Sequence, residues 1–209
     1  MNKKLIIFTS LLILCPMIFG IAIYNRLPET LPTHWNFNGQ IDGYSSRRFV
    51  VYIMPLMLLA IHLVCSLVIS LDPKNQNVSR KIKNLVLWIV PVVSVFVSYA
   101  IYSNALGKTV DITTLPFMFI GILFMIIGNY MPKTRQNYTI GIKIPWTLDN
   151  EDNWNATHRF AGKLWFVGGF IFLIASILKI VNPLIEIIFV LVIAIIPTIY
   201  SYIYYRNNQ

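Results

Sequence analysis

The sequence predicts an all-α membrane protein that crosses a bilayer about six times. Its 209 residues are 56% hydrophobic and only 12% charged, and the apolar residues form long uninterrupted blocks. A helix rises about 1.5 Å per residue, so about 20 apolar residues span a hydrocarbon core of about 30 Å. Such runs leave no stretch long enough to bury a separate water-soluble core. The expected spans are residues 5–24, 49–71, 85–106, 112–130, 164–180 and 183–205.

The first apolar run is expected to be a retained helix. Lys3 and Lys4 precede it, as in a signal peptide, but the run is as long as a complete span and five more spans follow. It also lacks a clear small-x-small cleavage site. The two cysteines, Cys15 and Cys65, both fall inside apolar runs, where no disulfide framework is expected.

The distribution of Lys and Arg predicts the orientation of the spans. Positively charged residues are retained on the cytoplasmic side of short loops. The side that holds both termini has twelve of the 17: Lys3, Lys4, Lys74, Arg80, Lys81, Lys83, Lys133, Arg135, Lys143, Arg159, Lys163 and Arg206. The other side has five: Arg26, Arg47, Arg48, Lys108 and Lys179. Both termini are therefore expected in the cytoplasm. The net charge of +9 is then explained by contact with anionic lipid, not by direct binding of nucleic acid.

Two connections between the spans are long enough to carry a site. We expect an amino-terminal region, residues 1–84, that holds two spans and an extracellular loop at 25–48. The remaining region, residues 85–209, is expected to hold four spans and a cytoplasmic loop at 131–163. We call residues 25–48 the outer loop and residues 131–163 the inner loop.

The outer loop is expected to be ordered. Pro28 and Pro32 favour an extended start, while Asn38-Gly39 and Asp42-Gly43 are turn signals. Its aromatic residues Trp35, Phe37 and Tyr44 admit two interpretations: an aromatic belt at the headgroup level or a recognition surface. The candidate recognition residues of this loop are Pro28, Pro32, His34, Trp35, Asn36, Gly39, Asp42 and Gly43.

The inner loop is expected to combine an extended piece with an amphipathic helix. Pro132 ends the fourth span, and residues 140–145 predict a strand-like segment. Thr147 or Asp149 is then expected to cap a helix that has Glu151 and Asp152 in its first turn. One face of this helix holds Trp154, His158, Ala161 and Trp165, and another holds Asn155, Arg159 and Lys163. This pattern predicts a helix near the inner interface that continues into the fifth span.

Polar residues of the inner loop suggest a buried hydrogen-bond network. Paired donors and acceptors that would fix the loop are offered by Asn129, Asn137, Thr147, His158 and Arg159. The simpler alternatives are that Arg135, Arg159 and Lys163 are solvated cations that face the lipid, and that Trp146 and Trp154 are interfacial anchors. Gly162, Gly168 and Gly169 permit a bend or close helix packing.

The sequence argues against catalysis. The three histidines are expected outside the cell (His34), within the membrane (His62) and inside the cell (His158), so they do not form one metal site. No metalloprotease, nucleophile-elbow or phosphate-loop motif is present, and no cofactor is expected. The intramembrane His62 is either a proton relay or a packed residue that bonds Ser66 or a neighbouring helix.

The inner-loop motif includes Asn129, Pro132, Lys133, Arg135, Asn137, Gly141, Pro145, Trp146, Thr147, Trp154, His158 and Arg159. With this string the chain resembles the SdpI family of bacterial membrane proteins, whose prototype gives immunity to a sporulation-delay toxin. The outer loop resembles a domain of unknown function that often forms the amino-terminal half of such proteins. One departure is Lys143-Ile144, which stands where Arg-Thr is usual.

The resemblance implies a non-catalytic immunity protein that protects the cell from a secreted, membrane-active peptide toxin. The outer loop would meet the toxin outside the cell. The inner loop would support the fold or meet a soluble winged-helix repressor in the cytoplasm and hold it at the membrane. The alternatives are a membrane transporter or channel, and a signalling receptor without immunity.

Overall fold

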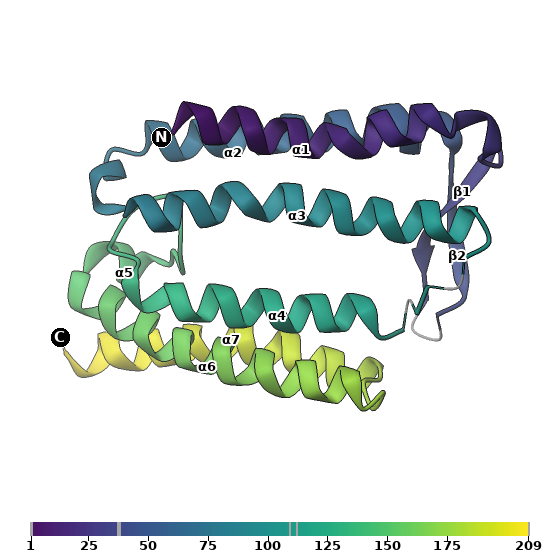
Figure 1. Ribbon diagram of the computed structural model, residues 1–209. Coiled ribbons are helices and arrows are strands. Elements are labelled where there is room, and N and C mark those ends of the chain that lie inside the picture. Colours follow the sequence, from purple (N-terminus) through teal and green to yellow (C-terminus); the bar gives the residue numbers. More distant parts are fainter. Residues whose placement is uncertain (1, 37–38, 109, 112, 209) are drawn as a thin grey trace. The chain divides into compact units, whose positions relative to one another are not determined.

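The computed structural model describes residues 2–36, 39–108, 110–111 and 113–208, so Phe37 and Asn38 of the predicted outer-loop surface lie outside the described residues (Figure 1). Within these ranges, six helices are long and apolar enough to cross a membrane. The predicted all-α, multi-pass membrane fold is therefore confirmed. The chain packs as two compact units: Met1–Ser70 with Arg80–Ile112, and Leu71–Ser79 with Thr113–Gln209. The division expected after residue 84 stays a prediction.

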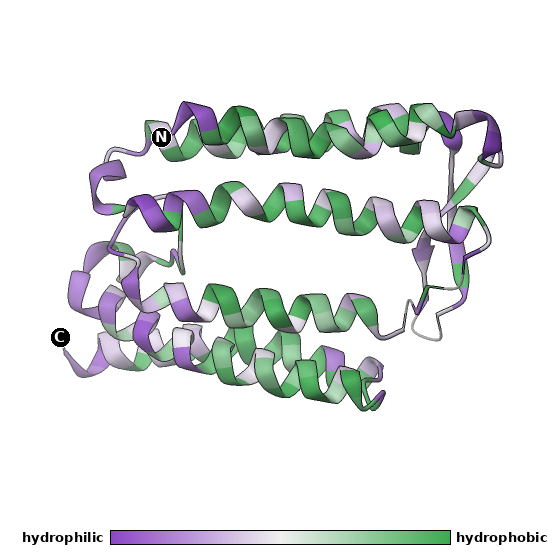
Figure 2. Ribbon diagram, viewed as in Figure 1, coloured by the Kyte–Doolittle hydropathy of each residue, from purple (hydrophilic) through white to green (hydrophobic). Residues whose placement is uncertain are grey.

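The first unit is built on three membrane-spanning helices. They are α1 (Lys3–Ala22), α2 (Met54–Leu71), which follows a π-helical turn at Phe49–Ile53, and α3 (Arg80–Ala105). Asn2 caps α1, because its side-chain oxygen accepts a hydrogen bond from the Lys4 amide at 3.1 Å. Hydrophobic residues fill the middle of these helices and hydrophilic residues gather toward their ends, as expected for a membrane solvent (Figure 2).

A small antiparallel sheet forms at one end of the first unit, where the outer loop folds as a hairpin (Figure 1). Strand β1 (Thr30–Trp35) pairs with β2 (Ile41–Ser46). The sequence analysis expected an ordered loop with an extended start, and it placed a turn at Asp42-Gly43. That turn prediction is wrong, since Gly43 lies within β2 opposite His34. A Cβ at Gly43 would lie 2.8 Å from the His34 Cβ, so the glycine permits close pairing there.

An apolar cluster fastens this hairpin to the helices of the first unit. Leu31 of β1 is fully buried, and Pro32 beside it is also buried. The cluster joins residues from the hairpin, its flanks and α3: Leu27, Leu31, Val50, Val51, Ile101 and Tyr102. Burial of this apolar surface is what holds the outer loop in one conformation.

The second unit contains the remaining three long helices, α4 (Leu115–Tyr130), α6 (Glu151–Ile177) and α7 (Pro183–Asn207). A 3-10 turn at Met131–Lys133 and the short helix α5 (Pro145–Asp149) lie between α4 and α6. Helices α4 and α6 approach closely at glycines. A Cβ at Gly128 would lie 2.8 Å from the Gly162 carbonyl oxygen, and one at Gly169 would lie 2.7 Å from that of Gly121. Small residues let membrane helices pack at this distance.

The inner loop differs from its prediction in two respects. Residues 140–144 form no strand, because their backbone groups bond to side chains instead of to a neighbouring strand. The cap of α6 is Asn150, whose side chain accepts from the Asn153 amide at 2.8 Å, and not Thr147 or Asp149. Glu151 and Asp152 do occupy its first turn. The prediction that this helix continues into the fifth span is confirmed, since α6 is one helix of 27 residues.

Candidate functional site

The outer hairpin presents exposed polar and aromatic side chains. The side chain of His34 is 72% exposed and hydrogen-bonds through Nδ1 to the Asp42 carboxylate, which is 45% exposed. Tyr44, farther along β2, is 60% exposed. The other predicted residues of this loop are less accessible: Trp35, Asn36, Gly39 and Gly43 are partly buried and Pro32 is buried, while Pro28 is exposed. His34, Asp42 and Tyr44 therefore belong to the accessible surface of the hairpin, together with Thr30, Gln40 and Ser46.

Arg47 stabilises the base of the hairpin, a role that the sequence analysis missed. Its Nη1 donates to the carbonyl oxygens of Tyr24 at 3.0 Å and Leu27 at 2.8 Å. The guanidinium also lies 4.3 Å from the centre of the Tyr24 ring. In the sequence Arg47 is indistinguishable from its neighbour Arg48, which is exposed.

Asn137 organises the start of the inner loop. Its side chain is fully buried and donates to the carbonyl oxygens of Arg135 at 2.8 Å and Ile140 at 2.9 Å. Its oxygen accepts from the backbone amides of Thr139 at 2.9 Å and Ile140 at 2.6 Å. One amide side chain thus satisfies four backbone groups of a turn that has no regular secondary structure.

Two residues outside the predicted motif complete this part of the network. Asp72 Oδ2 accepts from the Tyr138 amide at 2.9 Å and the Thr139 hydroxyl at 2.8 Å. The amide of Gln136 donates to the carbonyl oxygens of Thr147 at 3.0 Å and Leu148 at 2.9 Å, and it accepts from Lys74. The sequence analysis assigned no role in the loop to Asp72 or Gln136. Gln136 stands between Arg135 and Asn137 of the motif, which was the one available signal, whereas Asp72 is distant in the sequence.

Thr147 joins the loop to the short helix α5. Its buried hydroxyl accepts from the Ile144 amide at 3.1 Å and faces the carbonyl oxygens of Ile142 and Ile144 at 2.8 and 2.9 Å. The preceding residue in the motif, Trp146, packs against Tyr202 and Tyr205 of α7. These contacts place α5 against the end of α7 that carries the chain terminus.

Trp154 and His158 form the centre of the inner loop. Both are buried, and their rings stack with centroids 4.0 Å apart. Trp154 Nε1 donates to the Thr134 carbonyl oxygen at 2.6 Å. His158 Nε2 accepts from the Ile142 amide at 3.0 Å, and its Nδ1 donates to the Trp154 carbonyl oxygen at 2.8 Å. This pair of partners requires a neutral imidazole with the proton on Nδ1.

Gly141 permits the approach of the loop to these two rings. Its φ of +127° is a conformation that L side chains rarely adopt. A Cβ at this position would clash with His158 Nε2 and lie 3.0 Å from the Trp154 ring. The glycine in the motif is therefore required by both backbone conformation and space.

The predicted polar network is confirmed for Asn137, Thr147 and His158, but it is wrong for Asn129 and Arg159. Both of these side chains are exposed. Arg159 lies one position after buried His158, and the helical period turns it away from the network. With Lys133, Arg135 and Lys143 it forms an exposed set of cations around the loop, which we call the basic rim. The motif thus has a buried half and an exposed half.

The intramembrane His62 has a partner on a neighbouring helix. It is 1% exposed, and its Nε2 lies 2.9 Å from the Thr9 hydroxyl of α1. Ser66 instead donates to the backbone carbonyl oxygen of His62 at 2.9 Å. These contacts favour the packed interpretation of His62 over a proton relay.

Among the residues that the structure describes, no group of three or more His, Cys, Asp or Glu side chains is placed to hold a metal ion. In the inner loop the buried side chains of Asn137, Thr147, Trp154 and His158 are engaged with backbone groups. Their arrangement can hold a fold, and the exposed hairpin residues and basic rim can bind other molecules.

Comparison with known proteins matches both halves of the chain. Residues 133–201 match the SdpI/YfhL protein family, and residues 11–59 match a domain of unknown function, DUF1648. The chain is 32% identical over 215 aligned residues to Immunity protein SdpI of Bacillus subtilis (strain 168), covering 99% of this chain and 98% of the relative. No solved structure matches. This similarity, over nearly the full length of both proteins, shows that the chain belongs to the SdpI family.

Proposed function

We propose that this protein is an immunity protein that protects the cell from a secreted, membrane-active peptide toxin. The observation that carries the proposal is the 32% identity, over nearly the whole chain, to a protein named for immunity. The fold supports it, because a multi-pass membrane protein is placed where a membrane-active peptide acts. No enzymatic step is required for this role.

The outer hairpin is the proposed contact with the toxin. Its exposed His34, Asp42 and Tyr44 combine an aromatic ring with donors and acceptors on a rigid two-stranded support. Rigid amphipathic side chains anchor interfaces at low entropic cost. The apolar cluster beneath the hairpin favours this use, since it fixes the backbone before any partner binds.

The basic rim of the inner loop is the proposed contact with a cytoplasmic partner, such as a soluble winged-helix repressor. Trp154 and His158 are buried, so they support this surface without touching the partner. The exposed cations Lys133, Arg135, Lys143 and Arg159 are available to pair with acidic groups or with lipid. Recruitment would be measured by the membrane localisation of the repressor when all four cations are replaced by Gln.

Survival of toxin-sensitive bacteria tests the proposed immunity. Cells that express the protein are challenged with the sporulation-delay toxin and related peptides, and membrane accumulation of the protein is measured in the same cultures. The proposal expects survival that depends on expression. Death at full accumulation would contradict it. The same protein in liposomes should give no ion flux, and a flux without protection would favour the transporter alternative.

The proposed orientation places the hairpin outside the cell and both termini in the cytoplasm. In a background with Cys15→Ser and Cys65→Ser, single cysteines are introduced at the exposed positions Gln40 and Asp149. A membrane-impermeant maleimide applied to intact cells should label Gln40→Cys alone. Labelling of Asp149→Cys alone would reverse the orientation.

A further inference from the structure

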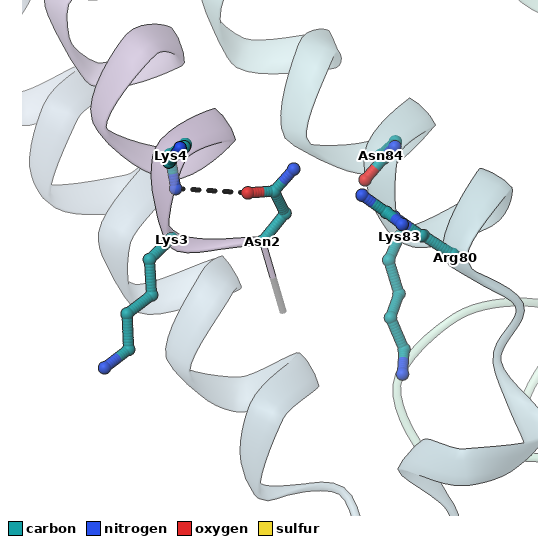
Figure 3. Close-up of a pocket in the computed structure, with 6 residues that line it drawn as sticks. All are labelled: Asn2, Lys3, Lys4, Arg80, Lys83 and Asn84. Atoms are coloured by element: carbon teal, nitrogen blue, oxygen red, sulfur yellow. Dashed lines mark hydrogen bonds between the residues drawn. The ribbon is translucent and has the colours of Figure 1, made fainter.

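An open pocket of about 510 Å³, which we call the cavity, lies between the beginnings of α1 and α3 in the first unit. Its lining comes from two short segments that are far apart in the sequence: Asn2, Lys3, Lys4, Arg80, Lys83 and Asn84. Figure 3 shows that Asn2, at the start of α1, and Arg80 of α3 point into the space between the two helices, while the side chains of Lys3 and Lys83 extend along its edge. Four of the six lining residues carry a positive charge.

No carboxylate balances these charges within the first unit. Its acidic residues Glu29, Asp42 and Asp111 all follow α1 or α3 in the chain, in connections at the other ends of these helices. In the part of the chain that the structure describes, the side chains of the four cations form no ion pair. Like charges that line one cavity repel each other, so an anion bound among them would relieve the repulsion.

The place of the cavity in the fold favours an anion further. Both α1 and α3 begin there, and the amino-terminal end of a helix carries a partial positive charge. The apolar runs of both helices start immediately beyond the cavity, at Leu5 and Leu85. This position matches the headgroup level of a bilayer, where phosphate groups are abundant.

We propose that this cavity binds a phosphate group, supplied either by the headgroup of an anionic phospholipid or by a free phosphate anion. Arg80 offers a planar fork of donors that suits a phosphate, and the lysines add point charges. Asn84 adds a neutral donor from the same helix. Only some of the neighbouring cations line the cavity: Lys81 lies between Arg80 and Lys83 in the sequence but is not part of the lining.

The test compares two charge-removing variants, Arg80→Gln and Lys83→Gln, with the matched control Lys81→Gln. The full chain is reconstituted in phosphatidylcholine nanodiscs, and its thermal unfolding is followed with added inorganic phosphate or with phosphatidylglycerol in the bilayer. Wild-type protein and Lys81→Gln should be stabilised. Loss of one cation from the cavity should weaken the apparent affinity about fivefold. Lys83→Arg keeps the charge and should keep most of the stabilisation.

The two ligands distinguish the source of the phosphate. Stabilisation by phosphatidylglycerol alone identifies a lipid site, and stabilisation by inorganic phosphate in a phosphatidylcholine bilayer identifies a soluble anion. Equal losses in Lys81→Gln and Lys83→Gln would overturn the proposal, because they would indicate diffuse surface charge. No stabilisation of the wild-type protein by either ligand would also overturn it. Without added ligand, the variants should unfold at or slightly above the wild-type temperature, because loss of one cation also reduces the repulsion. Unfolding at a much lower temperature would mean that the substitution damages the fold.

Discussion

The inner loop and the outer hairpin are both rich in polar residues, but they use them in opposite ways. The inner loop buries Asn137, Thr147 and His158, which are at most 1% exposed. The hairpin exposes its polar side chains, with His34 at 72% and Tyr44 at 60%. The buried groups replace a regular hydrogen-bond ladder in an irregular segment. The difference teaches that the buried half of the inner-loop motif specifies a fold, whereas the exposed side chains of the hairpin are accessible to a partner.

The largest effect is expected at Asn137. Asn137→Ala leaves the amides of Thr139 and Ile140 and two carbonyl oxygens without their partner. Each buried group left unpaired costs about 1 to 3 kcal/mol, so we expect a loss on the order of 4 kcal/mol. Thermal unfolding in detergent and the membrane level of the protein measure this loss. The control Asn129→Ala removes the same side chain at an exposed position and should behave as wild type.

Gly141→Ala should destabilise the protein by about 3 kcal/mol, because it adds backbone strain and displaces His158 from the Ile142 amide. The matched control is Gly107→Ala. Gly107 also has a positive φ, +74°, but its added Cβ would meet nothing within 4 Å. The control should cost only about 1 kcal/mol of backbone strain. Equal unfolding temperatures for the two variants would show that contact with His158 and Trp154 is unimportant.

Arg47→Ala tests whether the hairpin has a structural polar residue of its own. The variant removes two hydrogen bonds to carbonyl oxygens and the contact with the Tyr24 ring. We expect a loss of about 2 kcal/mol, since hydrogen bonds to charged groups are stronger than neutral ones. Arg48→Ala, the adjacent exposed arginine, is the control. Limited proteolysis within the outer loop should accelerate only in Arg47→Ala.

The smallest effect on stability is expected at Arg159. Arg159→Ala should unfold at the wild-type temperature, because the side chain is exposed and lies outside the buried network. Marked destabilisation would mean that Arg159 does belong to the network. If stability is unchanged, a defect in repressor recruitment would assign Arg159 to the basic rim as a contact residue.

The membrane architecture was predictable from the sequence because bilayer thickness sets the length of each apolar run. The expected second span, residues 49–71, coincides with the apolar helix at Phe49–Leu71. The fifth was expected to begin at residue 164, and its helix already begins at Glu151. Hydropathy alone starts a span at its first apolar residue. Helix α6 begins earlier, because hydrogen bonds and packing stabilise its amphipathic first turns.

The site was less predictable, because hydrogen-bond partners that are distant in the sequence decide which polar residues are buried. Asp72 reaches Thr139, and Asn153 accepts from the Ser201 hydroxyl at 2.6 Å. Neither pairing has a local signal. The helical period did place Trp154 and His158 on one face and Arg159 on another, so it already separated buried from exposed residues. Arg159 was assigned to the network because its side chain offers hydrogen-bond donors, although the helical period placed it on another face.

The measurement that tests the central claim most directly separates protection from folding. Cells that express His34→Ala/Tyr44→Ala are compared with wild-type and Asn137→Ala cells for toxin survival and for the membrane level of the protein. The hairpin variant should accumulate normally but lose toxin protection on the order of tenfold or more, as removal of exposed interface anchors does. Asn137→Ala should lose accumulation and survival together. Full survival of the hairpin variant at wild-type level would contradict the assignment of recognition to the hairpin.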